Sequence, residues 1–366
     1  GVRIMAYTTI DDPSQYFHTQ LYTGSSSGQS ITNDANAGDF KPDWVWIKRR
    51  DGDPNAVGNG HNEVFDSSRG VTKELYADLT SAEATTASSL TAFGTDGFTV
   101  GTEARVNSNG LSFVAWQWKA NGGTTTDGSS NDSVSTSNHQ ANTTAGFSIV
   151  SYTGNNSAGA TVAHGLGAAP TVLIVKNRDS DRGWMVYHHK NTSAPATEYL
   201  WLDDNNATSD YEGSWNDTDP TSTVFSVGNS NETNENNSKH IAYCFAEKQG
   251  YSKFGSYTGN GSTDGPFIYT GFKPAWVLIR QTSTAQNWIL YDNKINPFNE
   301  AVTKLSPNLS GVEDSSTGNN DIDMLSNGFK VTEDNNDMNE SGQNFIYMAF
   351  AEHPFVSSKG VPVTAR

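Results

Sequence analysis

The sequence predicts an all-β protein with three tandem antiparallel β-sandwich domains of jelly-roll type and long polar loops. Two observations support this prediction. Four sequence landmarks recur three times in the same order, which indicates an internal triplication. Hydrophobic residues make up only 34% of the chain, yet they are concentrated in strand-length runs, while Asn, Asp, Ser, Thr and Gly fill the intervals. Such a distribution is typical of many short strands joined by surface loops.

The four landmarks are a Tyr-Thr-Gly triplet, a Pro-led apolar run, a Phe-x-Val segment and an aromatic run. They lie at residues 22–24, 42–48, 98–100 and 114–118, then at 152–154, 170–176, 225–227 and 241–245, and finally at 257–259, 274–280, 329–331 and 346–350. The proline and the Phe-x-Val phenylalanine are 55 or 56 residues apart in every copy. We therefore expect three domains of about 100 residues, each with its own core, rather than a solenoid.

These spacings divide the chain into six segments. The expected segments are an N-terminal arm (1–21), a first β-sandwich repeat (22–120), a polar linker (121–145), a second repeat (146–249), a third repeat (250–353) and a C-terminal tail (354–366). The linker is assigned because it contains almost no large apolar residue.

Within each repeat the strands follow from the side-chain pattern. Residues 114–118 alternate between aromatic or aliphatic and small or polar side chains, which indicates a strand with one buried face. The Pro-led runs are apolar on both faces. Trp44 and Trp46 share one such face, so we expect them at an interface with a second sheet, a neighbouring repeat or another subunit. Helix is nearly absent, and residues 72–78 are the best candidate for a short one.

Composition excludes several classes of function. The net charge of −17 argues against nucleic acid and against an anionic membrane surface. No apolar stretch approaches the length that a membrane-spanning helix needs, so no membrane insertion is expected. The single cysteine, Cys244, lies in an apolar run and is interpreted as a buried, inert thiol.

The sequence offers no persuasive catalytic constellation, and we expect no enzyme. Phosphate-loop, Cys-x-x-Cys, metalloprotease and nucleophile-elbow motifs are absent. His188 and His189 form an isolated pair, whereas zinc needs three or four convergent ligands. Glu247 and Glu352 each follow an aromatic run, but an acid that recurs once per repeat is more typical of a solvent-facing or capping role than of glycosidase chemistry.

Calcium is the one cofactor that the sequence makes plausible. Four acids cluster in two loops of the third repeat and offer the hard oxygen ligands that calcium prefers. They are Asp321, Asp323, Asp334 and Asp337. Their spacing does not match an EF-hand, so a solvated acidic loop is the alternative interpretation.

A glycan site is the ligand site that the sequence favours most. Aromatic rings stack on sugar rings, and short polar side chains bind the hydroxyl groups. The loop at 211–219 supplies such residues in Tyr211, Trp215, Asn216 and Asp217. The alternative is that Trp215 folds back as a lid over the core.

Several stretches carry a resemblance to a known family: residues 16–24, 40–48, 114–123 and 350–355. They resemble uncharacterised structural proteins of tailed bacteriophages, frequent in marine and cyanobacterial phages. This resemblance covers nearly the whole chain and implies concanavalin-like β-sandwiches, a location in the virion and a non-enzymatic role. It brings no catalytic or ligand residue to carry over.

Three functions therefore stay open. The first is a tail-fibre or surface adhesion protein with other virion proteins and host-cell glycans as partners. The second is a capsid-decoration or architectural protein without a ligand. The third is a polysaccharide depolymerase, which would need two carboxylates facing each other across a groove. Fibre proteins of this kind are often homotrimers, but no heptad stretch in the sequence specifies one.

Overall fold

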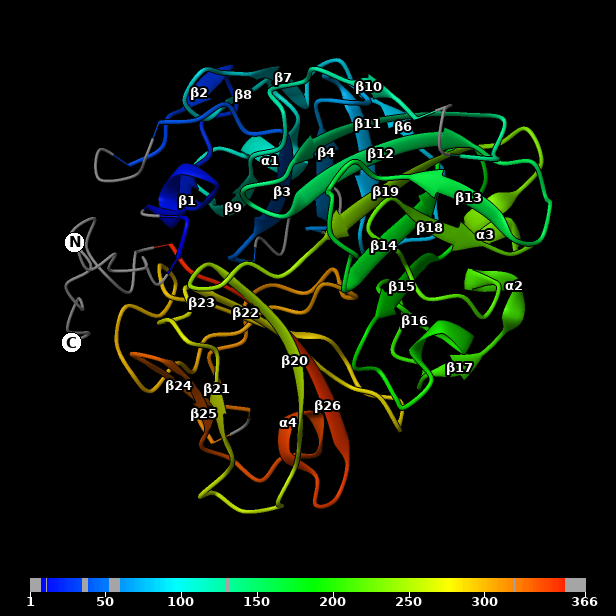
Figure 1. Cartoon of the computed structure of the whole chain (residues 1–366). Helices are drawn as coiled ribbons and strands as arrows, with labels where there is room; N and C mark the ends of the chain where they lie inside the picture. The colour runs from blue at the N-terminus through cyan, green and yellow to red at the C-terminus, as the bar shows by residue number, and fades with distance from the viewer. Residues whose placement is uncertain are drawn as a thin grey trace, which may run out of the picture.

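The computed structural model describes residues 8–10, 12–34, 39–52, 60–128, 132–318 and 320–352, and it consists almost entirely of antiparallel strands (Figure 1). Its core is built from three main sheets, one for each repeat, and four strands of each sheet are equivalent. The equivalent strand orders are β1-β9-β3-β4, β12-β19-β14-β15 and β20-β26-β22-β23. The aromatic run forms the second strand of each order and the Pro-led run forms the third, so the repeated landmarks mark equivalent places in the fold.

The first repeat has a main sheet and a smaller sheet over its outer face. The main sheet contains β1 (Phe17–Thr23), β9 (Ser112–Trp118), β3 (Trp44–Arg49), β4 (Asn62–Asp66), β5 (Lys73–Tyr76) and β6 (Ala84–Thr85). The smaller sheet contains β2 (Gln29–Ile31), β8 (Phe98–Val100) and β7 (Leu90–Phe93). Two short helices accompany them, η1 (Pro13–Gln15) and α1 (Ala104–Asn107).

The second repeat has the main sheet with the most strands. Its strands are β10 (Thr126–Asp127), β11 (Thr136–Asn142), β12 (Phe147–Thr153), β19 (Lys239–Phe245), β14 (Val172–Asn177), β15 (Trp184–His188), β16 (Glu198–Trp201) and β17 (Ser209–Asp210). The covering strands are β13 (Ala160–Ala163) and β18 (Val224–Val227). Its helices are η2 (Pro195–Thr197), α2 (Glu212–Trp215) and α3 (Asn231–Asn234).

The third repeat has the same arrangement with the fewest strands in its main sheet. Its main sheet contains β20 (Ser252–Thr258), β26 (Asn344–Phe350), β22 (Trp276–Gln281) and β23 (Ile289–Asp292). The covering sheet contains β21 (Phe267–Tyr269), β25 (Gly328–Val331) and β24 (Ile322–Leu325), and α4 (Asn336–Asn339) follows it. The helices of the described ranges have only three or four residues, and none is long and apolar enough to cross a membrane.

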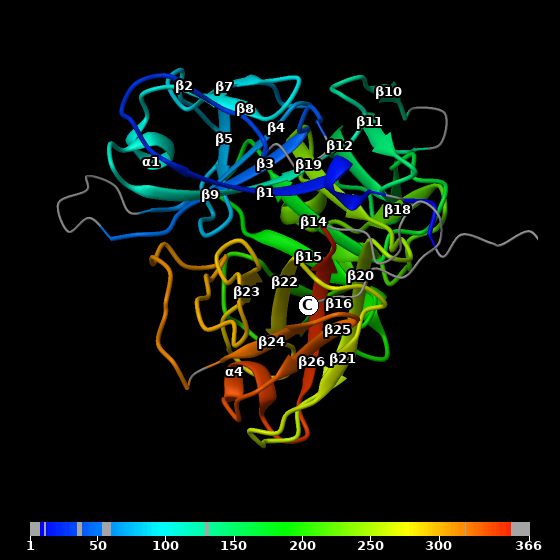
Figure 2. The same cartoon turned by 90° about the vertical axis from the view of Figure 1, so that its left-hand side faces the viewer.

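Each main sheet buries both faces, and the two faces belong to different cores. The outward face packs against the smaller sheet of the same repeat, which gives each repeat a separate hydrophobic cluster. The inward faces of all three main sheets join in one common cluster. Figures 1 and 2 show the result as three lobes, coloured blue to cyan, green, and yellow to red, around one centre. The expectation of three domains with only their own cores is therefore incomplete, because a shared core joins them.

The contacts across this shared core follow one cyclic order. A polar residue ends the fourth main strand at the same register in each repeat, opposite Trp44, Val172 or Trp276. The contacts of this residue are Tyr243 Oη to Asp66 Oδ2 (2.7 Å), Trp116 Nε1 to Asp292 Oδ2 (3.1 Å) and His188 Nε2 to the carbonyl oxygen of Tyr347 (3.2 Å). Repeat 1 thus contacts repeat 2, repeat 2 contacts repeat 3, and repeat 3 contacts repeat 1. This arrangement is a pseudo-threefold ring within one chain.

The Tyr-Thr-Gly triplet marks the end of the first main strand, and its tyrosine anchors the next loop. The hydroxyl groups of these tyrosines donate to the carbonyl oxygens of equivalent residues in the short helices. The pairs are Tyr22 to Val106 (2.7 Å), Tyr152 to Thr233 (2.5 Å) and Tyr257 to Met338 (2.7 Å). The following helical residue is a fully buried asparagine in every repeat, Asn107, Asn234 or Asn339.

Three expectations from the sequence require correction. The first repeat begins at Phe17, not at residue 22, because β1 pairs with β9 along seven residues. The expected linker at 121–145 contains β11, which pairs with β12 along its whole length. Its polar residues are typical of a linker in composition, yet Gln140 is fully buried and bonds the hydroxyl groups of Ser67 and Ser68. The helix expected at 72–78 is the strand β5, while the C-terminal tail lies outside the described residues.

Candidate functional site

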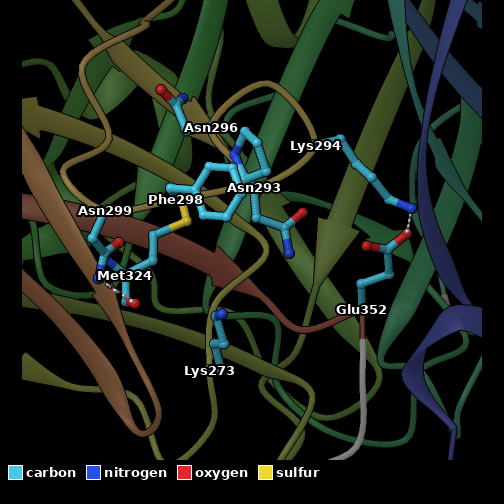
Figure 3. A pocket seen from close by; sticks show the side chains of 9 residues that line it. Lys273, Asn293, Lys294, Asn296, Phe298, Asn299, Met324 and Glu352 are labelled. Carbon is cyan, nitrogen blue, oxygen red and sulfur yellow. Dashed lines mark hydrogen bonds and ion pairs between the residues drawn. The ribbon is translucent and has the colours of Figure 1, made fainter. Parts of the chain in front are cut away.

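One candidate ligand site is a pocket of about 610 Å³ on the third repeat (Figure 3). Its walls come from Lys273 before β22, the loop after β23, the strand β24 and Glu352, which lies two residues after the end of β26. The lining residues are Lys273, Asn293, Lys294, Asn296, Pro297, Phe298, Asn299, Met324 and Glu352. Phe298 is the most prominent of them because 82% of it is exposed.

The loop that presents Phe298 is held by side-chain amides. Asn299 donates to the carbonyl oxygen of Met324 (3.1 Å) and accepts from its N–H group (2.9 Å). Asn296 makes the same two-way contact with Thr303, at 2.7 and 2.9 Å. These paired bonds fix the backbone on both sides of Phe298, so the exposed ring sits on an ordered loop.

Charged and polar groups line the pocket beside this ring. The ammonium group of Lys294 lies 2.7 Å from Asp34 and 3.5 Å from Glu352 (Figure 3). Burial opposes that charge, but the hydrogen bond to Asp34 and the charge of Glu352 outweigh it, and the pKa of Lys294 is raised. The amide oxygen of Asn293 is buried and has no hydrogen-bond partner in the described part of the chain. An apolar ring, an open acceptor and ammonium groups suit a polar ligand with an apolar face.

The structure places the four residues of the expected glycan loop in three different environments. Trp215 is 1% exposed, packs against Tyr187 and donates its indole N–H to the carbonyl oxygen of Glu198 (3.0 Å). It is a core residue at the end of α2, so its prediction as a stacking platform is wrong. Tyr211 is 46% exposed and lines a second pocket of about 370 Å³ together with Asn216. Asp217 is exposed but does not line this pocket.

The acidic group around Asp321 contains none of the other three acids of the expected calcium loops. Asp321 lies beside Glu300 and Glu333, two acids that the sequence pattern does not single out. Asp323 lies on β24 opposite Lys330, and Asp337 accepts from the side chain of Asn320 (3.2 Å). Asp334 does not belong to the acidic group around Asp321. Sequence spacing could not identify this group, because its three members come from three different segments.

Trp44 and Trp46 lie at an interface, and that interface is internal to the chain. The ring of Trp44 stacks on Tyr243 of the second repeat at 4.5 Å. Trp46 packs edge-on against Trp116 and is 1% exposed. A neighbouring repeat therefore covers this face, which was one of the three expected possibilities.

An unexpected pair of acids lies inside the first repeat. Arg105 contacts Glu63 (3.0 Å) and Glu74 (2.7 Å), and both carboxylates are fully buried. Burial, followed by the charge of Glu74, raises the pKa of Glu63 well above its usual value. A polymeric substrate has no access to a buried pair, so this arrangement has the features of a structural network.

The fold and these sites define an all-β protein with an internal triplication. The chain belongs to the family described as Domain of unknown function (DUF7483), whose model matches residues 12–354. No curated protein and no solved structure was found to match the chain.

Sequence reasoning missed the pocket around Phe298 and the buried asparagines of the three short helices. The asparagines leave a detectable signal, because each follows the Phe-x-Val phenylalanine by nine or ten residues. The pocket leaves a weaker signal, a phenylalanine between Pro297 and Asn299 in a polar stretch. Its other walls come from distant segments that only the fold brings together.

Proposed function

We propose that this protein is a non-enzymatic surface protein of a tailed-bacteriophage virion that binds host-cell glycans. The observation that supports it best is the pocket of the third repeat, where an exposed phenylalanine borders amide and ammonium groups. Aromatic rings bind the apolar faces of sugars, and amide groups bind their hydroxyls. Lys273 adds a positive charge, which favours sugars that carry carboxylates, whereas Asp34 and Glu352 offset the charge of Lys294.

The ring-like body supports a structural role on a particle. Its three repeats share one core, so a single chain offers three similarly built lobes. We further propose that the repeats descend from one copied sandwich module of jelly-roll, concanavalin-like type. The virion location rests on the sequence resemblance alone, and electron microscopy of labelled particles would test it by locating the chain on head or tail.

Two alternatives make different predictions. A capsid-decoration protein would be found on the head and would bind no glycan. A depolymerase would need two carboxylates flanking a groove. The buried Glu63–Glu74 pair does not favour this chemistry, and incubation of the protein with host capsule should release no oligosaccharide.

A glycan array of the full chain tests the proposed site. Phe298→Ala should reduce binding of its glycans by about fivefold or more, because stacking on an exposed ring is worth about 1 kcal/mol or more. Phe267→Ala is the matched control, since Phe267 is a 48% exposed aromatic of the same repeat that does not line this pocket.

The control variant should bind like the unaltered chain. Equal binding by all three proteins would remove the Phe298 pocket as the sugar site. The absence of any bound glycan, together with labelling of the capsid, would favour the decoration role instead.

A further inference from the structure

Three acids of the third repeat meet at one point, although they come from different segments. Glu300 follows the loop that presents Phe298, Asp321 precedes β24, and Glu333 follows β25. One carboxylate oxygen of each lies within 4.8 Å of the others. Like charges at this distance repel one another, so the arrangement needs a compensating positive charge.

Asp321 is the buried member of this group and has unused bonding capacity. It is 1% exposed, and its Oδ2 atom accepts from the N–H group of Gly318 (2.9 Å). Its Oδ1 atom is buried and finds no hydrogen-bond partner among the described residues. A buried carboxylate oxygen without a donor is costly, which indicates that a group outside the protein completes its bonding.

The residue before Glu333 also carries a buried oxygen without a hydrogen-bond partner among the described residues. The N–H group of Thr332 donates to the carbonyl oxygen of Asp321 (3.1 Å), which brings the residue before Glu333 against the acidic group. The hydroxyl oxygen of Thr332 is also buried and lacks a partner within the described ranges. Oxygen atoms are the ligands that calcium and other hard cations select.

Nearby protein cations offset the negative charge only in part. Lys304 attracts Asp321, but its ammonium group also lies 3.5 Å from Asp314. Lys304 is thus shared between Asp314 and a group of three carboxylates, so the acidic group still favours an added positive charge.

We propose that Glu300, Asp321 and Glu333 form a binding site for a calcium ion. Asp321 supplies the buried ligand, while the exposed Glu300 leaves one side open to the water molecules that complete a calcium coordination shell. The site also joins three segments, because Ala301 and Ile322 exchange backbone hydrogen bonds beside it, at 2.8 and 3.3 Å. A bound ion therefore fastens the loop after β23 to β24. This inference does not depend on glycan binding.

Calcium titration of the full chain, stripped with a chelator, tests the site. Calcium alone should bind with a stoichiometry that includes this site and should raise the melting temperature, because an ion that binds only the folded state stabilises it. Magnesium should bind more weakly, since it demands a strict octahedral shell. Asp321→Asn and Glu300→Gln should each weaken calcium binding by about tenfold or more.

Asp264→Asn is the matched control because it removes an equal charge from an exposed acid of the same repeat, outside the acidic group. It should bind calcium like the unaltered chain. Glu300→Gln guards against misfolding, since Glu300 is exposed. Calcium binding that is unchanged in Glu300→Gln and Asp321→Asn, or the absence of binding by the unaltered chain, would overturn the proposal.

Discussion

The Tyr-Thr-Gly triplet repeats because each of its ends has a specific contact. Its tyrosine donates to the backbone of the short helix, and the buried asparagine after that carbonyl accepts from the N–H group of the residue that follows the triplet. Asn107, for example, accepts from the N–H group of Ser25 (2.8 Å) and donates to the carbonyl oxygen of Gly101 (2.6 Å). The glycine between them has no room for a side chain, since a Cβ atom on Gly24 would overlap the carbonyl oxygen of Ser108. The triplet therefore fixes the end of the first main strand against the short helix.

Gly24→Ala tests this close contact between the triplet and the residues after the short helix. The added methyl group must displace backbone, so we expect a loss of about 2 kcal/mol or more in the free energy of unfolding. Gly28→Ala is the matched control, because a Cβ atom there meets only the carbonyl oxygen of Val100, at 3.7 Å. The control should stay within about 0.5 kcal/mol of the unaltered chain in urea denaturation. Equal free energies of unfolding for the two variants would contradict this role of Gly24.

At the scale of the strand, each Pro-led run ends in a buried cation that reaches the preceding repeat around the ring. Each of the three is fully buried. The contacts are Lys48 Nζ to the carbonyl oxygen of Leu309 (3.0 Å), Lys176 Nζ to that of Thr80 (2.7 Å) and Arg280 Nη2 to that of Asn206 (2.6 Å). Burial lowers the pKa of Lys48 and Lys176 to about 8 and that of Arg280 to about 10.

These lysines predict a dependence of stability on pH. Their folded pKa lies below the unfolded value, so the unfolded chain binds more protons between about pH 8 and pH 10. The free energy of unfolding should therefore rise with pH in that window, by about 1 kcal/mol per lysine between about pH 8 and pH 9. Lys48→Met should remove the contribution of Lys48 to this pH dependence, as measured by urea denaturation across this range. An identical pH slope in both proteins would show that burial does not perturb Lys48.

The sequence predicts strands well where the side-chain pattern is local. The aromatic and Pro-led runs are strands in all three repeats, because their apolar residues must be buried on one or both faces. The sequence does not predict the structure of residues whose partners lie far away along the chain. Residues of β11 look like a linker, but they pair with β12 and bury Gln140 against the first repeat. Trp215 looks like a surface aromatic, but α2 turns it into the core. Likewise, the acidic group around Asp321 exists only because β24 pairs with β25 and Ala301 pairs with Ile322.

At the scale of the whole molecule, the shared core is the main consequence of the triplication. Single-repeat sandwiches would leave one face of each main sheet exposed, and that face is rich in large aromatic residues. In this chain Trp118, Phe245 and Phe350 occupy equivalent positions opposite the Pro-led runs and gather at the centre. The rings of Trp118 and Phe350 are 5.7 Å apart, and those of Phe245 and Phe350 are 5.9 Å apart. A repeat that unfolded alone would expose this cluster to water.

Differential scanning calorimetry of the full chain tests this shared core most directly. Because no repeat can unfold without exposing the common cluster, we predict one cooperative transition whose calorimetric and van 't Hoff enthalpies agree. Two or three separable transitions, each with the enthalpy of about 100 residues, would contradict the shared core and mean that the repeats are independent domains.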